Sequence, residues 1–270
     1  MKASVHWLNR YLHPAGLNPH QVEEFLTHAG FPIDAREDLP RGDARLEVEI
    51  TSNRGDCLSH VGLAREIAAK SGRVLKMLEI PALKTSGAIA SAVALENAAP
   101  DACPRFTIHV IRGVTIGPSP QWLVDALESV GQRSINNVVD VTNYINFELG
   151  NPCHAFDLAK LSGRKVVVRY AREGEPLTTL DGKQRKLKAD EVVVADAERA
   201  QSLAGVIGGG DSEVSASTKD VVLEMATWDP VAVRRAARRH QVKTDASHRF
   251  ERYVDARTLD YAARRAAALI

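Results

Sequence analysis

The sequence has few cysteines, and they do not form any known ligand pattern. Its 270 residues contain only Cys57, Cys103 and Cys153, which are far apart and include no C-x-x-C pair. This spacing argues against a zinc site and against a disulfide framework, and it is typical of the reducing cytoplasm. We therefore expect a cytoplasmic protein that needs no metal or other cofactor.

The sequence also has little net charge and no long apolar run. Its formal net charge is +1, so no global basic field directs the whole chain to nucleic acid, and an RNA site must be a local patch. The N-terminal segment MKASVHWLNRYLHP lacks the apolar core of a signal peptide. No window is long and apolar enough to span a bilayer, so we expect no membrane partner. With so little net charge, we also expect no DNA partner.

The order of the remaining patterns predicts an α+β fold. A small helical domain with one strand occupies residues 1–80, where a helix starts at Pro19 and ends at Gly30. The alternation of Leu46, Val48 and Ile50 predicts its strand, and a helix follows over residues 58–71. Residues 81–101 are rich in alanine and serine, which indicates a linker with an edge strand at residues 90–95. A larger domain of β-sheets flanked by helices then covers residues 102–270.

One stretch, Ser134 to Leu158, concentrates polar side chains around a turn. A β-branched run, Val138–Val141, leads to Thr142 and Asn143, and Gly150-Asn151-Pro152 then forces a turn. This turn brings His154 back towards Thr142 and Asn143. On the residues alone, two interpretations stay open: these groups satisfy buried backbone atoms, or they form a site.

The same stretch carries a family resemblance. The motifs INNVVDVTNYINFELGNPCHAFDL, LAGVIGGGDSEV, VVLEMATWDPVAVRRAARR and TDASHRFER occur in order. Together they resemble the editing domain of the β subunit of bacterial phenylalanyl-tRNA synthetase, which hydrolyses tyrosine wrongly attached to the phenylalanine tRNA. The resemblance implies a sandwich-like sheet domain of unusual topology over residues 102–270. It also implies that the family's inserted tRNA-binding module and its later modules are missing from this chain.

The resemblance implies a set of site residues. The catalytic candidates are His154, Asn143, Thr142 and Glu224. The substrate-binding candidates are Arg133, Ala204, Gly205, Gly208, Thr244 and Ala246. Ester hydrolysis requires a placed water and a stabilised oxyanion, and the reference pKa of histidine suits His154 to orienting or deprotonating that water. A carboxylate at Glu224 gives a charge-assisted bond to the tyrosine phenol, and such a site rejects phenylalanine by about 10⁴–10⁵ in favourable cases.

A basic cluster lies late in the chain. Its members are Arg234, Arg235, Arg238, Arg239 and Lys243. Two interpretations again stay open: a solvated helix face with ion pairs, or a stripe that contacts the phosphates of a tRNA acceptor end.

These observations predict a free-standing editing hydrolase that deacylates mischarged Tyr-tRNA(Phe), with tRNA and the synthetase subunits as partners. The alternatives are a non-catalytic module that binds tRNA or a synthetase, and an N-terminal piece of a longer β subunit. One residue departs from the family motif, since Tyr253 stands where family members carry a glycine. We therefore expect the turn at Tyr253 to differ.

Overall fold

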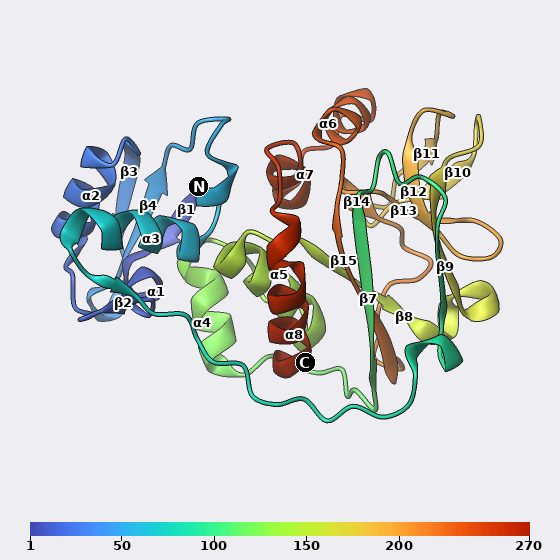
Figure 1. The fold of residues 1–270 in the computed structure, drawn as a ribbon, viewed down its shortest axis with the longest axis horizontal. Helices are drawn as coiled ribbons and strands as arrows, with labels where there is room; N and C mark the ends of the chain where they lie inside the picture. The colour runs from blue at the N-terminus through green and yellow to red at the C-terminus, as the bar shows by residue number, and fades with distance from the viewer. The chain divides into compact units, whose positions relative to one another are not determined.

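The computed structural model describes residues 1–270, which form two compact units (Figure 1). Met1–Pro81 and Pro118–Gly150 make up the first unit, and Ala82–Gly117 and Asn151–Ile270 make up the second. Packing therefore divides the chain differently from the predicted domain boundaries, because residues 118–150 pack with the N-terminal unit. The mixed arrangement of helices and sheets confirms the predicted α+β class.

The first unit combines helices with two small sheets. Its elements are β1 (Lys2–Ser4), α1 (Val5–Asn9), β2 (Leu12–His13), α2 (Pro19–His28), β3 (Ile33–Asp38), β4 (Ala44–Val48), α3 (His60–Ser71), β5 (Val74–Leu75), α4 (Gln121–Ser129) and α5 (Asn137–Leu149). An antiparallel sheet has the order β1-β4-β3, and β2 pairs with β5. Of the five strands in this unit, the sequence analysis predicted only β4. Strand β3 reads IDARED and lies at an exposed edge, so it lacks the alternation of a half-buried strand.

Helix α5 shows how a local cap overrides β-branched composition. The side chain of Asn136 accepts hydrogen bonds from the backbone N–H groups of Val138 and Val139, and Gly150, with φ of 75°, ends the helix. Val138, Val141 and Ile145 are buried at helical spacing. The β-branched run is therefore the start of a helix, and the predicted turn at Gly150 is its C-terminal cap.

Ring stacking and a buried hydrogen bond join α5 to the N-terminal elements within the first unit. Trp7 is stacked between His60, at 3.9 Å between ring centroids, and Tyr144, at 4.6 Å. Tyr11 donates a 2.6 Å hydrogen bond to the buried carboxylate of Glu148, and burial beside that charge raises the pKa of Tyr11. These contacts explain why residues 118–150 belong to this unit.

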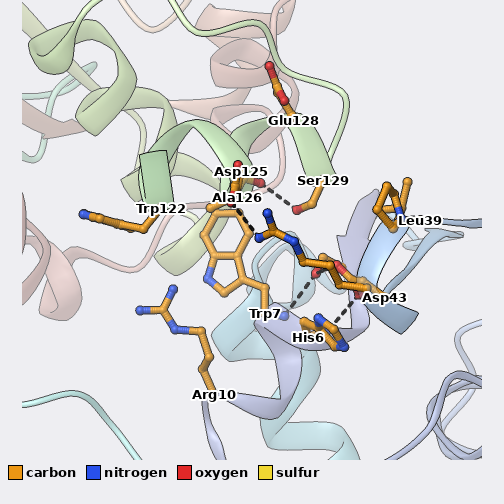
Figure 2. A pocket seen from close by; sticks show the side chains of 13 residues that line it. His6, Trp7, Arg10, Leu39, Asp43, Trp122, Asp125, Ala126, Glu128 and Ser129 are labelled. Carbon is orange, nitrogen blue, oxygen red and sulfur yellow. Dashed lines mark hydrogen bonds and ion pairs between the residues drawn. The ribbon is translucent and has the colours of Figure 1, made fainter. Parts of the chain in front are cut away.

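A cavity of about 520 Å³ opens beside the same tryptophan (Figure 2). It lies between α1, the β3–β4 connection and α4, with Trp122 on one wall and Asp43 on another. Both carboxylate oxygens of Asp43 are occupied by hydrogen bonds from Ser4, His6 and Ala44. None of the site residues predicted from the sequence lines this cavity.

The second unit is built on two larger sheets and a two-stranded one. Its elements are β6 (Ala94–Asn97), β7 (Arg105–Arg112), β8 (Cys153–Asp157), β9 (Lys165–Tyr170), β10 (Pro176–Thr178), β11 (Gln184–Lys186), β12 (Val192–Ala195), β13 (Ala200–Leu203), β14 (Ile207–Gly208), β15 (Asp220–Thr227), α6 (Pro230–Arg239), α7 (Asp245–Phe250) and α8 (Leu259–Leu269). Strands β10 and β11 pair in the two-stranded sheet. A five-stranded sheet has the order β14-β13-β12-β9-β6, and only β6 and β9 pair in parallel. A three-stranded antiparallel sheet has the order β7-β15-β8.

One apolar core lies between these two sheets. The three-stranded sheet contributes Val222, Ala226 and Phe156, and the five-stranded sheet contributes the valines of β9 and β12. Helix α8 contacts β15 and β7. The two sheets therefore enclose a core in the manner of a sandwich. None of the helices in either unit combines the length and the apolar character needed to cross a bilayer.

The turn at Tyr253 has an uncommon backbone. Tyr253 has φ of 66°, in the left-handed region that favours glycine, and its side chain is exposed. The left-handed conformation is therefore present even though tyrosine occupies the position.

The bond between Tyr11 and Glu148 generates a stability prediction. Tyr11→Phe removes the hydroxyl that Glu148 accepts inside the first unit, so the free energy of unfolding should fall by about 1–3 kcal/mol. Urea denaturation followed by tryptophan fluorescence measures this loss. Tyr253→Phe is the matched control, because it deletes an exposed hydroxyl and should change little. Equal effects of the two substitutions would show that the Tyr11 bond does not stabilise the unit.

Candidate functional site

Glu224 and His154 face each other on neighbouring strands of the three-stranded sheet. Strands β15 and β8 run antiparallel, and their register places Glu224 directly opposite His154. Directly opposed residues share one face of a sheet, and alternation puts Val222, Ala226 and Phe156 on this face too. Because those three residues belong to the core between the sheets, the carboxyl and imidazole groups also project into that space.

The carboxyl group of Glu224 is buried without compensation. The residue is only 7% exposed, and its Oε2 atom has no hydrogen-bond partner. Burial raises the pKa of Glu224 to about 8, and no cation lies near enough to oppose this effect. The protonated acid therefore predominates at neutral pH, whereas the sequence analysis assumed a carboxylate.

The imidazole of His154 is neutral for the same physical reason. Its Nε2 atom is buried and has no hydrogen-bond partner, and the ring lies edge-on to Phe156 at 4.5 Å between centroids. Burial lowers the pKa of His154 to about 4. At neutral pH the ring can therefore accept one hydrogen bond and donate another, as placing a water molecule requires.

Gly208 leaves room for this imidazole. A Cβ atom built on Gly208 would lie 2.5 Å from Cε1 and 2.9 Å from Nε2 of His154, which is closer than real Cβ contacts. The same Cβ would lie 3.0 Å from Cδ1 of Leu180, a side chain that is 45% exposed at the tip of the β10–β11 hairpin. Leu180 therefore borders the histidine. The sequence analysis missed it, since the segment LDGK reads only as a turn.

Gly205 and Ala204 lie in the tight turn between β13 and β14. Gly205 has φ of 68°, and a Cβ there would lie 2.9 Å from Cδ1 of Trp228 and 3.0 Å from Cγ2 of Val233. Backbone conformation and packing thus both require glycine at this position. Ala204 is buried in the same core.

Thr244 and Ala246 lie at the start of α7. Thr244 is the N-cap of this helix, and its hydroxyl also donates a 2.8 Å hydrogen bond to the carbonyl of Val206. Ala246 is half-buried and packs against the core between the sheets. Within the second unit the structure joins Glu224 to His154 and His154 to Gly208, whereas Ala204, Gly205, Thr244 and Ala246 lie in the β13–β14 turn or at the start of α7.

The other three predicted residues belong to the first unit. Thr142 and Asn143 are half-buried on α5, and the hydroxyl of Thr142 donates to the carbonyl of Val139. Arg133 is exposed between α4 and α5. Convergence of these residues with His154 stays a prediction.

The basic cluster on α6 and just after it divides into two groups. Arg239 forms ion pairs with Asp190 at 2.7 Å and Glu191 at 2.9 Å, and Arg235 pairs with Asp190 at 3.4 Å. These bonds hold the pKa of Asp190 down to about 2, with Arg239 as the main cause. The other three members of the cluster are exposed and form no ion pair: Arg234, Arg238 and Lys243.

One group of acidic and thiol side chains has the spacing of metal ligands. Asp56, Cys57 and Glu66 offer ligand atoms within 4.8 Å of one another. Arg54 and Arg65, however, form ion pairs with both carboxylates, and burial raises the pKa of the Cys57 thiol to about 12. The neighbouring cations make this an ion-pair network with little affinity for a metal ion.

Known proteins are similar to this chain along its whole length. The B3/4 domain model matches residues 102–270. A phenylalanine–tRNA ligase beta subunit from Anaeromyxobacter dehalogenans is 51% identical over 90% of this chain and 30% of its own length. The corresponding subunit from Rhodopirellula baltica is 44% identical over 100% of this chain and 39% of its own length.

A solved N-terminal fragment of the phenylalanyl-tRNA synthetase beta subunit from Pyrococcus horikoshii aligns with 89% of this chain and 74% of its own. That alignment has 16% identity and a TM-score of 0.46, so the assignment rests on the sequence matches. The matched relatives extend far beyond the region they share with this chain. The chain belongs to the B3/4 domain family and resembles part of the phenylalanine–tRNA ligase beta subunit.

Proposed function

We propose that this chain performs the editing step of a phenylalanine–tRNA ligase beta subunit. In this step it hydrolyses the ester of tyrosine wrongly attached to the phenylalanine tRNA. The opposed pair of Glu224 and His154 is the observation that carries the proposal, because two polar groups without partners are buried on one face of a sheet. Buried polar groups that lack partners reduce stability, and two of them directly opposed on one sheet face support a ligand that completes both.

Glu224 selects the substrate in this proposal. Its Oε2 atom forms a hydrogen bond with the tyrosine phenol, which can donate or accept. Phenylalanine lacks the hydroxyl and leaves Oε2 unpaired, at a cost of about 1–3 kcal/mol for a buried polar group. The protonated acid still supplies this discrimination.

His154 serves the reacting ester. Its unpartnered Nε2 atom is available to bind the attacking water, and Gly208 lies close beside the ring. A neutral imidazole needs no proton loss before it accepts one from water. Contact of Thr142 and Asn143 with the ribose or the ester carbonyl stays a prediction from the family resemblance. The Thr142 hydroxyl gives its proton to the carbonyl of Val139, so towards a substrate it can only accept, as from a ribose hydroxyl.

The tRNA is held by part of the basic cluster. We assign phosphate binding to Arg234, Arg238 and Lys243, because their charges are not neutralised by acidic neighbours. Arg235 and Arg239 instead stabilise the fold by joining α6 to Asp190 and Glu191. The proposed partners are therefore the acceptor end of tRNA and the alpha subunit of the ligase.

The two active-site roles predict different kinetic defects. Glu224→Ala should reduce the preference for Tyr-tRNA(Phe) over Phe-tRNA(Phe) by about 1–3 kcal/mol, because the phenol loses its partner. His154→Ala should slow hydrolysis of both esters by about 10²-fold or more, since the water loses its base. Release of labelled amino acid from each charged tRNA measures both effects.

Matched controls exist for both substitutions. Glu198→Ala and His28→Ala remove the same groups from exposed positions, so they should leave hydrolysis unchanged. An equal loss for both esters in Glu224→Ala would remove Glu224 as the selector. Full activity in His154→Ala would exclude the histidine from the reaction.

The divided basic cluster predicts a contrast in salt dependence. Replacing Arg234 and Arg238 together by glutamine should weaken tRNA binding and reduce the slope of log K against log[salt] by about 0.7–0.9 for each phosphate that is no longer neutralised. Replacing Arg235 and Arg239 should lower stability and leave this slope nearly unchanged. Filter binding across a salt series measures the slope. The opposite pattern would reassign phosphate binding to the ion-paired arginines.

A further inference from the structure

We propose that Thr244 is a positioning residue that holds strand β14 against His154, and that it does not contact the substrate itself. The resemblance to the family placed Thr244 among substrate-binding residues. This inference deepens the proposed editing function and rests on it. It is drawn from the hydrogen bonds of a single hydroxyl group.

The hydroxyl of Thr244 is already committed to protein atoms. It donates its only proton to the carbonyl oxygen of Val206 at 2.8 Å, and it accepts the backbone N–H of Ser247 at 3.0 Å. The Ser247 hydroxyl in turn accepts the backbone N–H of Thr244 at 3.0 Å, which completes a capping box. A hydroxyl has one donor, so Thr244 has none left for a substrate.

The hydrogen bond to Val206 holds the backbone only two residues from Gly208, which lies beside the His154 ring. Gly208 lies two residues beyond Val206, and its lack of a Cβ makes the space for the His154 ring. The turn before Val206 is fixed from the other direction, because Gly205 packs against Trp228 and Val233. The backbone N–H of Leu180 also bonds to the carbonyl of Gly208 at 2.9 Å. With Thr244 released, β14 keeps these restraints and its pairing with β13, and it loses the hydrogen bond that ties it to α7.

The same hydroxyl sets the first turn of α7, which carries Ala246. A single group therefore fixes the separation between Gly208 on β14 and Ala246 on α7, and both are candidates for the pocket lining. A change of about 1 Å in such a separation is enough to lower a catalytic rate markedly. Thr244 thus helps to set the distance between β14 and the start of α7, and it does so without contacting the substrate.

Two substitutions separate the cap from the bond to Val206. Thr244→Ser keeps the hydroxyl and both of its hydrogen bonds. Thr244→Asp keeps an acceptor for the helix N-terminus, where a carboxylate is favoured, but has no proton to give to Val206. The aspartate variant should therefore keep α7 capped and lose only the bond to Val206, so that β14 is released from α7.

The decisive readout is the NMR signal of the His154 imidazole, assigned by its loss in His154→Ala. In Thr244→Asp we expect the Cε1–H signal of His154 to shift and kcat for deacylation to fall roughly tenfold, with little change in KM. Thr244→Ser should restore both to wild-type values. A raised KM with an unmoved His154 signal would overturn the proposal and make Thr244 a direct substrate contact.

The NMR signal also separates this inference from the proposed function. If the wild-type chain releases no tyrosine, the editing proposal fails, yet a shifted His154 signal in Thr244→Asp still supports the positioning role. An unshifted signal and unchanged kinetics in Thr244→Asp would overturn the positioning role whatever the activity of the wild type.

Discussion

The opposition of Glu224 and His154 across two paired strands is the constraint on which the second unit depends. Strand register alone brings the two groups together, since β15 and β8 are more than sixty residues apart in sequence. Both groups point into a core that is otherwise apolar, so both are held in their neutral forms. An acid and a base that are both uncharged can coexist there without the repulsion or the large desolvation cost of ions.

The rest of the unit accommodates this pair. Glycines replace larger residues where the backbone must approach an aromatic ring, at Gly208 beside His154 and at Gly205 beside Trp228. Because Glu224 holds its proton more tightly in the folded state than in the unfolded chain, its contribution to stability is fully present below about pH 4.5. That contribution is lost as the pH rises towards about 8. The fold therefore gives up some stability at neutral pH to keep a polar group ready for a ligand, as is common at functional sites.

Much of the fold could be predicted from sequence because its local signals agree. Asn18 and Pro19 mark the start of α2 with a capping box, and the alternation of Leu46 and Val48 marks β4. Helix α5 could not be predicted from composition, because its β-branched start suggests a strand and only the cap at Asn136 reverses that preference. The packing of α5 with the N-terminal unit depends on Tyr11 and Glu148, a pair too distant in sequence to recognise.

The site was predicted unevenly for similar reasons. Motifs identified Glu224 and His154, but protonation states depend on burial, which the sequence does not specify. The role of Leu180 also depends on tertiary contact, since an apolar residue at a hairpin tip gives no signal of its own. The family resemblance placed Thr244 among the substrate-binding candidates, whereas its hydrogen bond to Val206 is visible only in three dimensions.

The protonation state of Glu224 tests the account most directly. A ¹³C NMR titration of the glutamate side-chain carboxyls, with the Glu224 signal assigned by its absence in Glu224→Gln, follows this one group through the pH range. We expect a midpoint at about 8, so that the acid form predominates at neutral pH. A midpoint near the ordinary glutamate value of about 4.3 would contradict the account, because it would show that Glu224 is solvated or paired with a cation.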